Sequence, residues 1–395
     1  MSTLDYRDFL ADAPRVEAFR RAIESTVEAG DVVLDLGTGL GTYGMFAARA
    51  GARVVAVEPA PIVEVARSLA RDNGLSDRMT FLRGRVEELE PPELADVLIF
   101  EDYAPYLYHG ETSRILSAVR DRWLQPAPRG VPYRVRALLA PVSCAESYRA
   151  IWPFVNEDLF GLDIGRFRRQ LLNGLHAVSW DPDVLLAEAT EVDRFDPLRP
   201  ERLKLEASVS WTAARPGILH GLGLWIDLDL ADGIEFSNGP SGRSTGWDQR
   251  LLPLLEPVTV EAGDIIEARV RTLGPGSGEP DWWSWRVRAG ADDPQELDTF
   301  RGVPLSLDTL GRARLDRRPR LGGAGRVRRA VLELIDGERT TAEIVRELRE
   351  RFPREVSSDR QALRAVAREL EGDDAETGNP MGAEERLAEA RGRTR

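Results

Sequence analysis

The chain has 395 residues and a formal net charge of −13, which indicates two or three domains and disfavours nucleic acid as the main partner. Its longest apolar runs, such as residues 135–143, are too short and too interrupted to span a bilayer. The lone cysteine, Cys144, excludes an intramolecular disulfide framework, and the scattered histidines give no zinc site. The N-terminus lacks an apolar signal core, so we expect a cytoplasmic protein. From the preceding observations we expect no metal, membrane or nucleic-acid partner.

The first part of the chain alternates between helical and strand patterns. Residues 14–28 carry apolar side chains at helical spacing, and the apolar run 31–36 stops at Gly37, which is typical of a buried parallel strand. Further helices are expected over 42–50 and 62–73, and further strands over 53–57, 79–83 and 97–100. This alternation predicts a Rossmann-like α/β domain with a doubly wound sheet, residues 1–132.

From about residue 133 the pattern changes to short apolar segments separated by Pro, Gly and Asp. These segments are 134–142, 203–213, 221–230, 255–261 and 264–273. They predict an antiparallel β-barrel domain over residues 133–305. Its aromatic cluster, Trp282, Trp283 and Trp285, favours core packing or a dimer contact over ligand stacking.

Three short amphipathic helices are predicted near the C-terminus. The first covers about 326–335, the second begins at Thr340 or Thr341 with Glu343 as a capping partner, and the third covers about 359–371. We expect a small helical domain over residues 306–372. The polar tail, residues 373–395, is predicted to be disordered.

A glycine-rich turn follows the first strand and precedes a helix. Gly37, Gly39 and Gly41 allow a tight turn and close approach to a ligand, and Asp35 comes just before them. Glu58 ends the next strand, where an acid accepts hydrogen bonds from ribose hydroxyls. NAD and S-adenosylmethionine both use this layout. The spacing resembles motif I of class I methyltransferases more than a dehydrogenase fingerprint, so we expect S-adenosylmethionine as cofactor.

Several further motifs resemble protein arginine methyltransferases. Residues 5–15 look like the N-terminal helix that those enzymes fold over the cofactor, 45–51 like the helix after motif I, and 84–88 like the segment that reads adenine. The resemblance implies that Arg15 pairs with the methionine carboxylate and that Glu87 binds the adenine amino group. Trp247 lies in a segment similar to the family's Thr-His-Trp loop, and by this resemblance it contacts substrate.

The family's catalytic hairpin carries two glutamates, because guanidinium stays protonated and must be held and oriented by acids. An ungapped match aligns Glu101 with the first of these glutamates, but Glu111 then lies one residue after the position of the second. Starting from Asp102 instead restores the spacing to Glu111 with a shorter acid. The aromatic residues between these acids either line a substrate slot or pack; they are Tyr103, Tyr106, Tyr108 and His109. Gly246 replaces the histidine of the Thr-His-Trp loop.

Two accessory features are expected. Residues 331–345 resemble the small helical, winged-helix-like domains of the PqqD type, which bind leader peptides of ribosomally made natural products. The strands that such a domain requires are not evident before residue 325. Family members dimerise through an arm, for which residues 163–195 are the expected equivalent, so the resemblance implies a homodimer.

The combined hypothesis is a methyltransferase that acts on an arginine, or a similar side chain, of a peptide or protein. Two alternatives stay open at this point. One is methylation of free arginine or another small molecule, with a purely structural C-terminal unit. The other is a non-catalytic adaptor, which the altered hairpin and Gly246 would suit.

Overall fold

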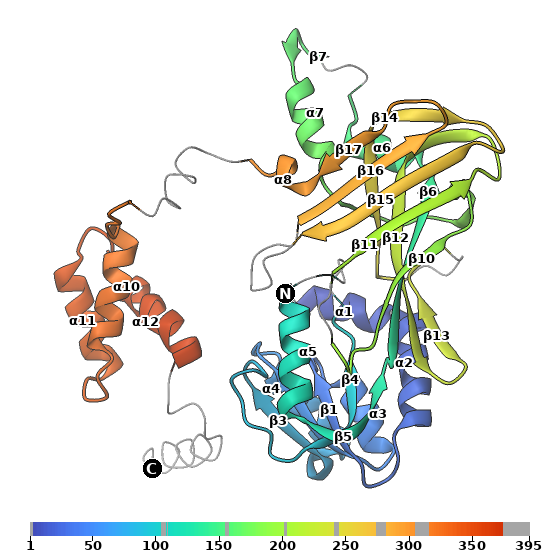
Figure 1. Ribbon diagram of the computed structural model, residues 1–395. Coiled ribbons are helices and arrows are strands. Elements are labelled where there is room, and N and C mark those ends of the chain that lie inside the picture. Colours follow the sequence, from blue (N-terminus) through green and yellow to red (C-terminus); the bar gives the residue numbers. More distant parts are fainter. Residues whose placement is uncertain are drawn as a thin grey trace. The chain divides into compact units, whose positions relative to one another are not determined.

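A computed structural model describes residues 3–103, 108, 110–154, 158–200, 204–240, 245–273, 282–304 and 316–373. The chain divides into two compact units, Met1–Pro304 and Leu305–Arg395 (Figure 1). Tyr106, His109 and the tail predicted to be disordered beyond residue 373 lie outside the described residues. No helix of the described part is long and apolar enough to cross a membrane.

The N-terminal half of the first unit contains a five-stranded parallel sheet flanked by helices, which confirms the predicted Rossmann-like fold. Its strands are β1 (Val32–Leu36), β2 (Arg53–Glu58), β3 (Met79–Arg83), β4 (Ala95–Phe100) and β5 (Leu124–Val131). Its helices are α1 (Thr3–Ala11), α2 (Ala13–Thr26), α3 (Thr42–Arg49), α4 (Val63–Asp72) and α5 (Gly110–Arg122). The strand order β3-β2-β1-β4-β5 reverses direction between β1 and β4. Ligands of such sheets bind outside the carboxyl ends of the strands at this switch point.

The second half of the unit consists of two antiparallel sheets. The larger has the order β10-β6-β12-β14-β9, and β13 also pairs with β12. These strands are β6 (Arg134–Val142), β9 (His176–Val178), β10 (Thr190–Phe195), β12 (Gly217–Ala231), β13 (Ile234–Ser237) and β14 (Gln249–Val260). The smaller has the order β11-β15-β16-β17, formed by β11 (Glu206–Thr212), β15 (Ile265–Leu273), β16 (Trp282–Ala289) and β17 (Gln295–Asp298). The antiparallel prediction is confirmed, but no ladder among the described strands joins the two sheets into one closed barrel.

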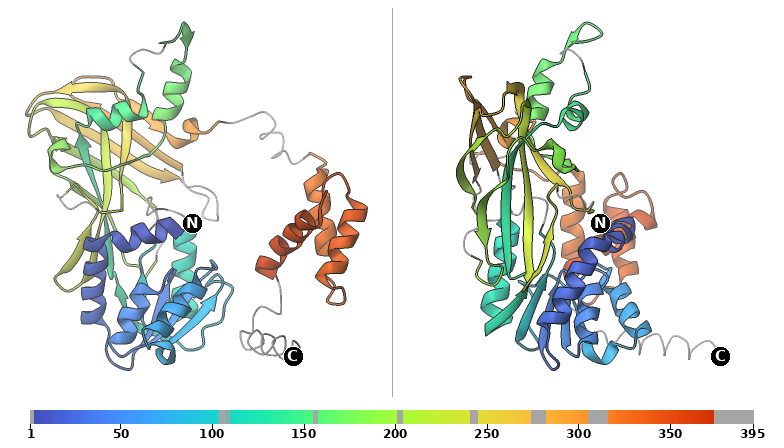
Figure 2. Two further views of the ribbon diagram at one scale, coloured as in Figure 1. Left: turned by 180° about the vertical axis from the view of Figure 1, so that it is seen from behind. Right: turned by 90° about the vertical axis from the view of Figure 1, so that its right-hand side faces the viewer.

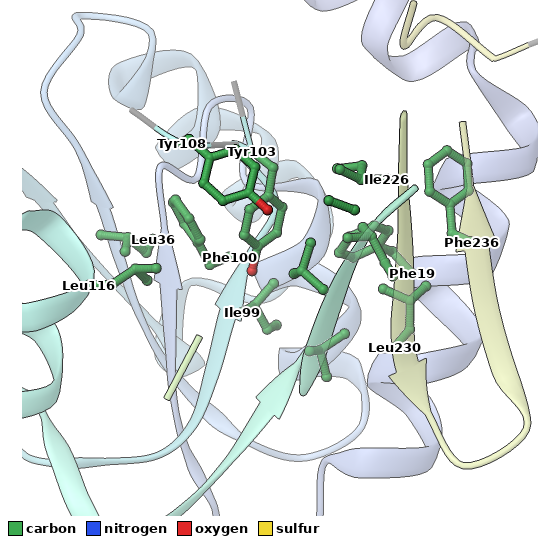
Figure 3. Close-up of a cluster of buried hydrophobic side chains, with 14 of the residues drawn as sticks. Phe19, Leu36, Ile99, Phe100, Tyr103, Tyr108, Leu116, Ile226, Leu230 and Phe236 are labelled. Atoms are coloured by element: carbon green, nitrogen blue, oxygen red, sulfur yellow. The ribbon is translucent and has the colours of Figure 1, made fainter. Parts of the chain in front are cut away.

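One hydrophobic core runs through both halves of this unit. The long strand β12 and its partner β13 extend alongside α2 (Figures 1 and 2). There Phe19 of α2 meets side chains of β12 and β13, while Phe100 and Tyr103 belong to the same cluster (Figure 3). Between the antiparallel sheets, Trp285 is fully buried and its Nε1 donates to the carbonyl of Pro253 at 2.8 Å. Trp283 and Trp285 therefore pack in the core.

A hairpin and a helix project from the antiparallel sheets (Figure 1). After α6 (Ala145–Ile151), the short strands β7 (Asp158–Leu159) and β8 (Leu162–Asp163) lead into α7 (Gly165–Leu172). The arm expected over 163–195 is thus only partly a projection, because residues 176–178 pair with β14 as β9 and residues 190–195 pair with β6 as β10. The projection starts earlier and ends by Leu172.

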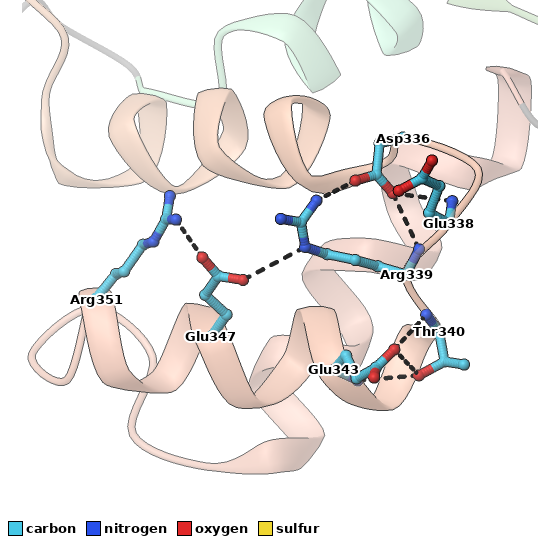
Figure 4. Close-up of polar contacts among 7 residues, drawn as sticks. All are labelled: Asp336, Glu338, Arg339, Thr340, Glu343, Glu347 and Arg351. Atoms are coloured by element: carbon cyan, nitrogen blue, oxygen red, sulfur yellow. Dashed lines mark hydrogen bonds and ion pairs between the residues drawn. The ribbon is translucent and has the colours of Figure 1, made fainter.

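The second unit is a small three-helix domain with its own core. It contains α10 (Gly323–Leu334), α11 (Thr341–Arg351) and α12 (Asp359–Asp373), packed around Val331, Leu348 and Val366. Before α11, the Asp336 carboxylate accepts from two backbone amides, and Thr340 with Glu343 forms the predicted capping box (Figure 4). Residues 316–373 contain no strand, so the expected winged-helix character is absent from the described part of this unit.

Candidate functional site

A cavity of about 620 Å³ opens at the switch point of the parallel sheet. One wall comes from α1 and from the loops after β1, β2 and β4, and the other from β6, β12, β14 and the loop before β14. Its polar and charged lining residues are Tyr6, Arg15, Asp35, Thr38, Thr42, Tyr43, Glu58, Glu101, Asp102, Tyr103, Tyr108, Asn238, Asp248 and Arg250. The volume is that of a typical site for a cofactor-sized molecule.

The glycine loop after β1 forms the floor of this cavity. Gly37, Gly39 and Gly41 all have positive φ, at 72°, 53° and 78°, a region that glycine adopts without strain. A Cβ on Gly39 would lie 3.2 Å from the ring of Tyr6, so the loop and α1 touch closely at this point. Gly37 and Gly39 line the cavity, so the backbone at these two positions faces a ligand without an intervening side chain.

Asp35 acts mainly on this loop. Its carboxylate accepts from the Thr38 hydroxyl and from the Gly44 amide at 2.9 Å, near the start of α3. Burial raises the pKa of Asp35 to about 6, against the opposing effect of these hydrogen bonds. Asp35 lines the cavity, but its bonded oxygen is directed at the protein.

Glu58 connects the loop to the end of β2. Its Oε2 accepts from the Gly39 amide at 3.0 Å, and its Oε1 accepts from the Ala60 amide at 2.9 Å. The side chain is held in one orientation at the cavity wall. Each carboxylate oxygen can accept a second hydrogen bond, which two ribose hydroxyls would provide.

Arg15 is a buried cation at the junction of both walls. Its Nη1 lies 2.8 Å from Oε1 of Glu101, and its Nε lies 3.5 Å from Oδ2 of Asp12. Its guanidinium also lies over the Trp247 ring, 5.3 Å from the centroid. Asp12 in turn accepts from the backbone amide of Gly246 at 2.8 Å. Arg15, which was expected to serve the cofactor alone, therefore also holds the first candidate catalytic acid.

Glu101 follows β4 directly and points into the cavity. Burial raises its pKa to about 7, Arg15 opposes this shift, and the nearby Asp102 adds to it. Asp102 is exposed and also lines the cavity. Glu111 lies in the first turn of α5, and its side chain is outside the described residues. The structure thus brings Glu101 and Asp102 to the cavity and leaves the role of Glu111 a prediction.

The aromatic candidates differ from one another. The ring of Tyr103 lines the cavity between Phe100 and Phe195, but its hydroxyl is enclosed by protein and makes no hydrogen bond with described residues. Tyr108 also lines the cavity, and its hydroxyl donates to Asp193 at 2.7 Å. Figure 3 shows both rings beside Phe100. Both tyrosines therefore have a packing role at the wall.

Two described cofactor candidates, Gly41 and Glu87, lie outside the cavity lining. Glu87 contacts other protein groups. Its carboxylate lies 2.7 Å from Nη1 of Arg114 and 3.6 Å from Nη2 of Arg85. In this structure it links α5 to the loop after β3, and its adenine-binding role stays a prediction.

Sequence reasoning missed the wall that the antiparallel sheets contribute. Trp225 and Asn238, together with Arg250, line the cavity from β12, β14 and the segment after β13. No local motif marks these residues, because the pairing of distant strands brings them to the site. Asp12 carried a usable signal, since an acid three residues before Arg15 is a helix N-cap.

The residues present fit S-adenosylmethionine. A backbone cradle, an acid already fixed by that cradle, and a buried cation lie around one cavity of suitable size. Glu58 would hold the ribose, Arg15 the carboxylate of the methionine portion, and the loop 37–41 the chain between them.

Comparison with known proteins agrees with this geometry. Residues 33–126 match a family model described as a methyltransferase domain. The chain is 29% identical over 283 residues to protein arginine N-methyltransferase 1 of Schizosaccharomyces pombe, covering 70% of this chain and 79% of the relative. It is 27% identical over 312 residues to a probable protein arginine N-methyltransferase 6.2 of Oryza sativa, covering 67% of this chain and 78% of the relative.

Solved structures of similar fold include two enzymes of the same kind. Arabidopsis thaliana protein arginine methyltransferase 10 has a TM-score of 0.65 at 25% identity, over 75% of this chain and 98% of its own. The Trypanosoma brucei protein arginine methyltransferase 1 enzyme–prozyme complex was solved with AdoHcy. It has a TM-score of 0.69 at 22% identity, over 74% of this chain and 97% of its own. Fold and site define a class I methyltransferase. The chain is an S-adenosylmethionine-dependent enzyme, similar to protein arginine methyltransferases.

Proposed function

We propose that the protein methylates a guanidinium nitrogen of an arginine side chain in a peptide or protein. The observation that carries this proposal is the position of Glu101. It lies where the cofactor side of the cavity meets the antiparallel sheets, is oriented by Arg15 at 2.8 Å, and has the exposed Asp102 beside it. The names of the relatives support the same reaction.

The chemistry of guanidinium explains the need for acids. Its high pKa keeps it protonated, so its nitrogens are poor nucleophiles. A carboxylate pair binds the cation by forked hydrogen bonds and fixes the direction of one nitrogen. Bound S-adenosylmethionine supplies an electrophilic methyl group. The nitrogen must also lose one proton, and Glu101, with a pKa raised to about 7, is suited to accept it at Oε1 or Oε2.

A substitution at Glu101 tests the proposal. We expect Glu101→Gln to lower methylation of arginine-containing peptides by at least about 100-fold, while binding of S-adenosylhomocysteine, measured by calorimetry, changes only a few-fold. Glu64→Gln, at an exposed acid of α4 outside the cavity, is the matched control with normal activity. Mass spectrometry of the products separates arginine peptides from free arginine. Wild-type protein that binds cofactor but methylates no arginine would contradict the proposal.

We also propose that the C-terminal unit binds peptide, such as the leader of a ribosomally made natural-product precursor. Three features support this: the unit has its own core, residues 331–345 resemble domains of the PqqD type, and about a quarter of the chain has no counterpart in the solved structures above. We further propose a homodimer that forms through the projecting segment. The apolar side chains of Phe160, Leu162 and Phe167 are exposed there and would be buried by a second copy. Sedimentation of wild type and Phe160→Asp tests the dimer.

A further inference from the structure

The outer face of the four-stranded sheet carries a concentration of arginines. Side chains alternate along β15 and β16, so Val270 and Trp285 point into the core while their neighbours face outward. Four outward positions are occupied by Arg269, Arg271, Arg286 and Arg288. We call these four residues, with Ser208 and Ser210 of β11, the arginine face. In Figure 1 this sheet lies at the front of the upper part of the first unit.

The strand register places like charges side by side. Arg269 of β15 is directly opposite Arg286 of β16, and on its other side it is opposite Ser208. Facing like charges on neighbouring strands destabilise a sheet. The arrangement becomes favourable when an anion lies between them.

The described ion pairs involve only two of the four arginines. Arg269 pairs with Glu206 at 2.7 Å, and Arg288 pairs with Glu267 at 2.8 Å. Within the described part of the chain, Arg271 donates only to the Ser284 hydroxyl, at 3.3 Å. Arg286 makes no ion pair with any described residue. Glu296 of β17 lies directly opposite Arg286 in the register. The charged residues that line the hollow between Arg269 and Arg286 are nevertheless three arginines and one glutamate, so this part of the face carries positive charge on a chain whose overall net charge is −13.

The same residues surround a hollow in the surface. It has a volume of about 450 Å³, and its polar lining consists of Ser208, Ser210, Glu267, Arg269, Arg286 and Arg288. Guanidinium groups match the geometry of carboxylate and phosphate oxygens, and serine hydroxyls add further donors. None of these residues lines the catalytic cavity.

We propose that the arginine face is a binding site for an acidic peptide segment, whose carboxylate or phosphate groups enter the hollow between Arg269 and Arg286. The hollow has room for one or two side-chain groups. The net charge of −13 opposes long polyanions such as nucleic acid. Where the acidic segment belongs to a substrate protein, the site binds that protein at a distance from the catalytic cavity. This consequence rests on the proposed function.

The test measures binding of labelled peptides to the full chain by fluorescence anisotropy. The probes are an octaglutamate peptide, a peptide with two phosphoserines, and an octalysine peptide. We expect both acidic probes to bind, with affinity falling steeply as salt is raised, and the lysine probe not to bind to this face. Comparison of the two acidic probes identifies the preferred anion. The assay needs no methylation, so its result is independent of the proposed function.

Charge variants locate the site. The double variant Arg269→Glu/Arg286→Glu should weaken binding of the acidic probes by at least about tenfold, and Arg286→Ala alone by a few-fold. Arg71→Glu, an exposed arginine at the end of α4, is the matched control and should bind normally. Unchanged binding of S-adenosylhomocysteine shows that each variant is folded. Equal affinity in wild type and double variant overturns the proposal, as does tighter binding of an oligonucleotide than of either acidic peptide.

Discussion

At the scale of single residues, the contact between Arg15 and Glu101 joins the residue proposed to bind the cofactor carboxylate to the acid proposed to bind the substrate guanidinium. Arg15 is nearly fully buried, and its guanidinium has acids on two sides, Glu101 and Asp12. A cation in this position keeps a buried carboxylate ionised that would otherwise take up a proton. The opposing effects leave the pKa of Glu101 at about 7, well above the usual range for a glutamate. The carboxyl group of Glu101 therefore gains or loses its proton when the pH changes near neutrality.

This pKa predicts the pH dependence of the enzyme. In the proposed function the substrate guanidinium binds the ionised form of Glu101, so kcat/KM for an arginine peptide should rise with pH and level off above about 7. Asp102 contributes to the raised pKa, so Asp102→Asn should shift the rise to lower pH. The measurement is kcat/KM from pH 5.5 to 9 for both proteins. A rise centred near pH 4.5, or no shift in the variant, would show that Glu101 does not control it.

The two tyrosines at the cavity wall form a matched pair for a stability test. The hydroxyl of Tyr103 is enclosed and has no hydrogen-bond partner among the described residues, which is unfavourable, so Tyr103→Phe should raise the free energy of unfolding by about 1 kcal/mol. The hydroxyl of Tyr108 donates to Asp193 at 2.7 Å, so Tyr108→Phe should lower it by about 2 kcal/mol. Urea unfolding measures both. If Tyr103 instead binds substrate through its hydroxyl, Tyr103→Phe would raise KM, an outcome against the packing role.

At the scale of elements, the sequence predicted those parts whose pattern is local. The run that ends at Gly37 became β1, and the alternation with helices predicted a parallel sheet. The strand β5 was missed because Pro126 and Pro128 interrupt its pattern, yet an edge strand tolerates proline. Residues 176–178 and 190–195 were assigned to an arm because nothing local reveals that they pair with β14 and β6.

The same distinction applies to the candidate site. The glycine loop and Glu58 could be identified because one turn and the adjacent strand carry the whole motif. Trp225 and Arg250 could not, since they reach the cavity only when the antiparallel sheets pack beside the parallel one. Glu87 shows a limit of motif matching, because the resemblance that selects this acid does not determine what its side chain contacts, which is Arg114 in the structure.

At the scale of the whole molecule, the division after Pro304 separates two cores. Every lining residue of the catalytic cavity belongs to the first unit, whereas the described core of the second consists only of side chains from α10, α11, α12 and the segment between the last two. Residues that fold around separate cores can unfold separately. The catalytic machinery should therefore not depend on the second unit for its stability.

A protein that ends at Pro304 tests this independence. We expect it to fold, to bind S-adenosylhomocysteine with an affinity within about threefold of the full chain, and to methylate short arginine peptides at a similar kcat, because the cavity is complete within residues 1–304. Precursor-length substrates should show a raised KM if the second unit binds peptide, since a tether raises local concentration. Calorimetry, circular dichroism and steady-state kinetics provide the measurements. A truncated protein that is folded but cannot bind cofactor would mean that the second unit contributes to the site, and equal KM values for long substrates would remove the peptide-binding role.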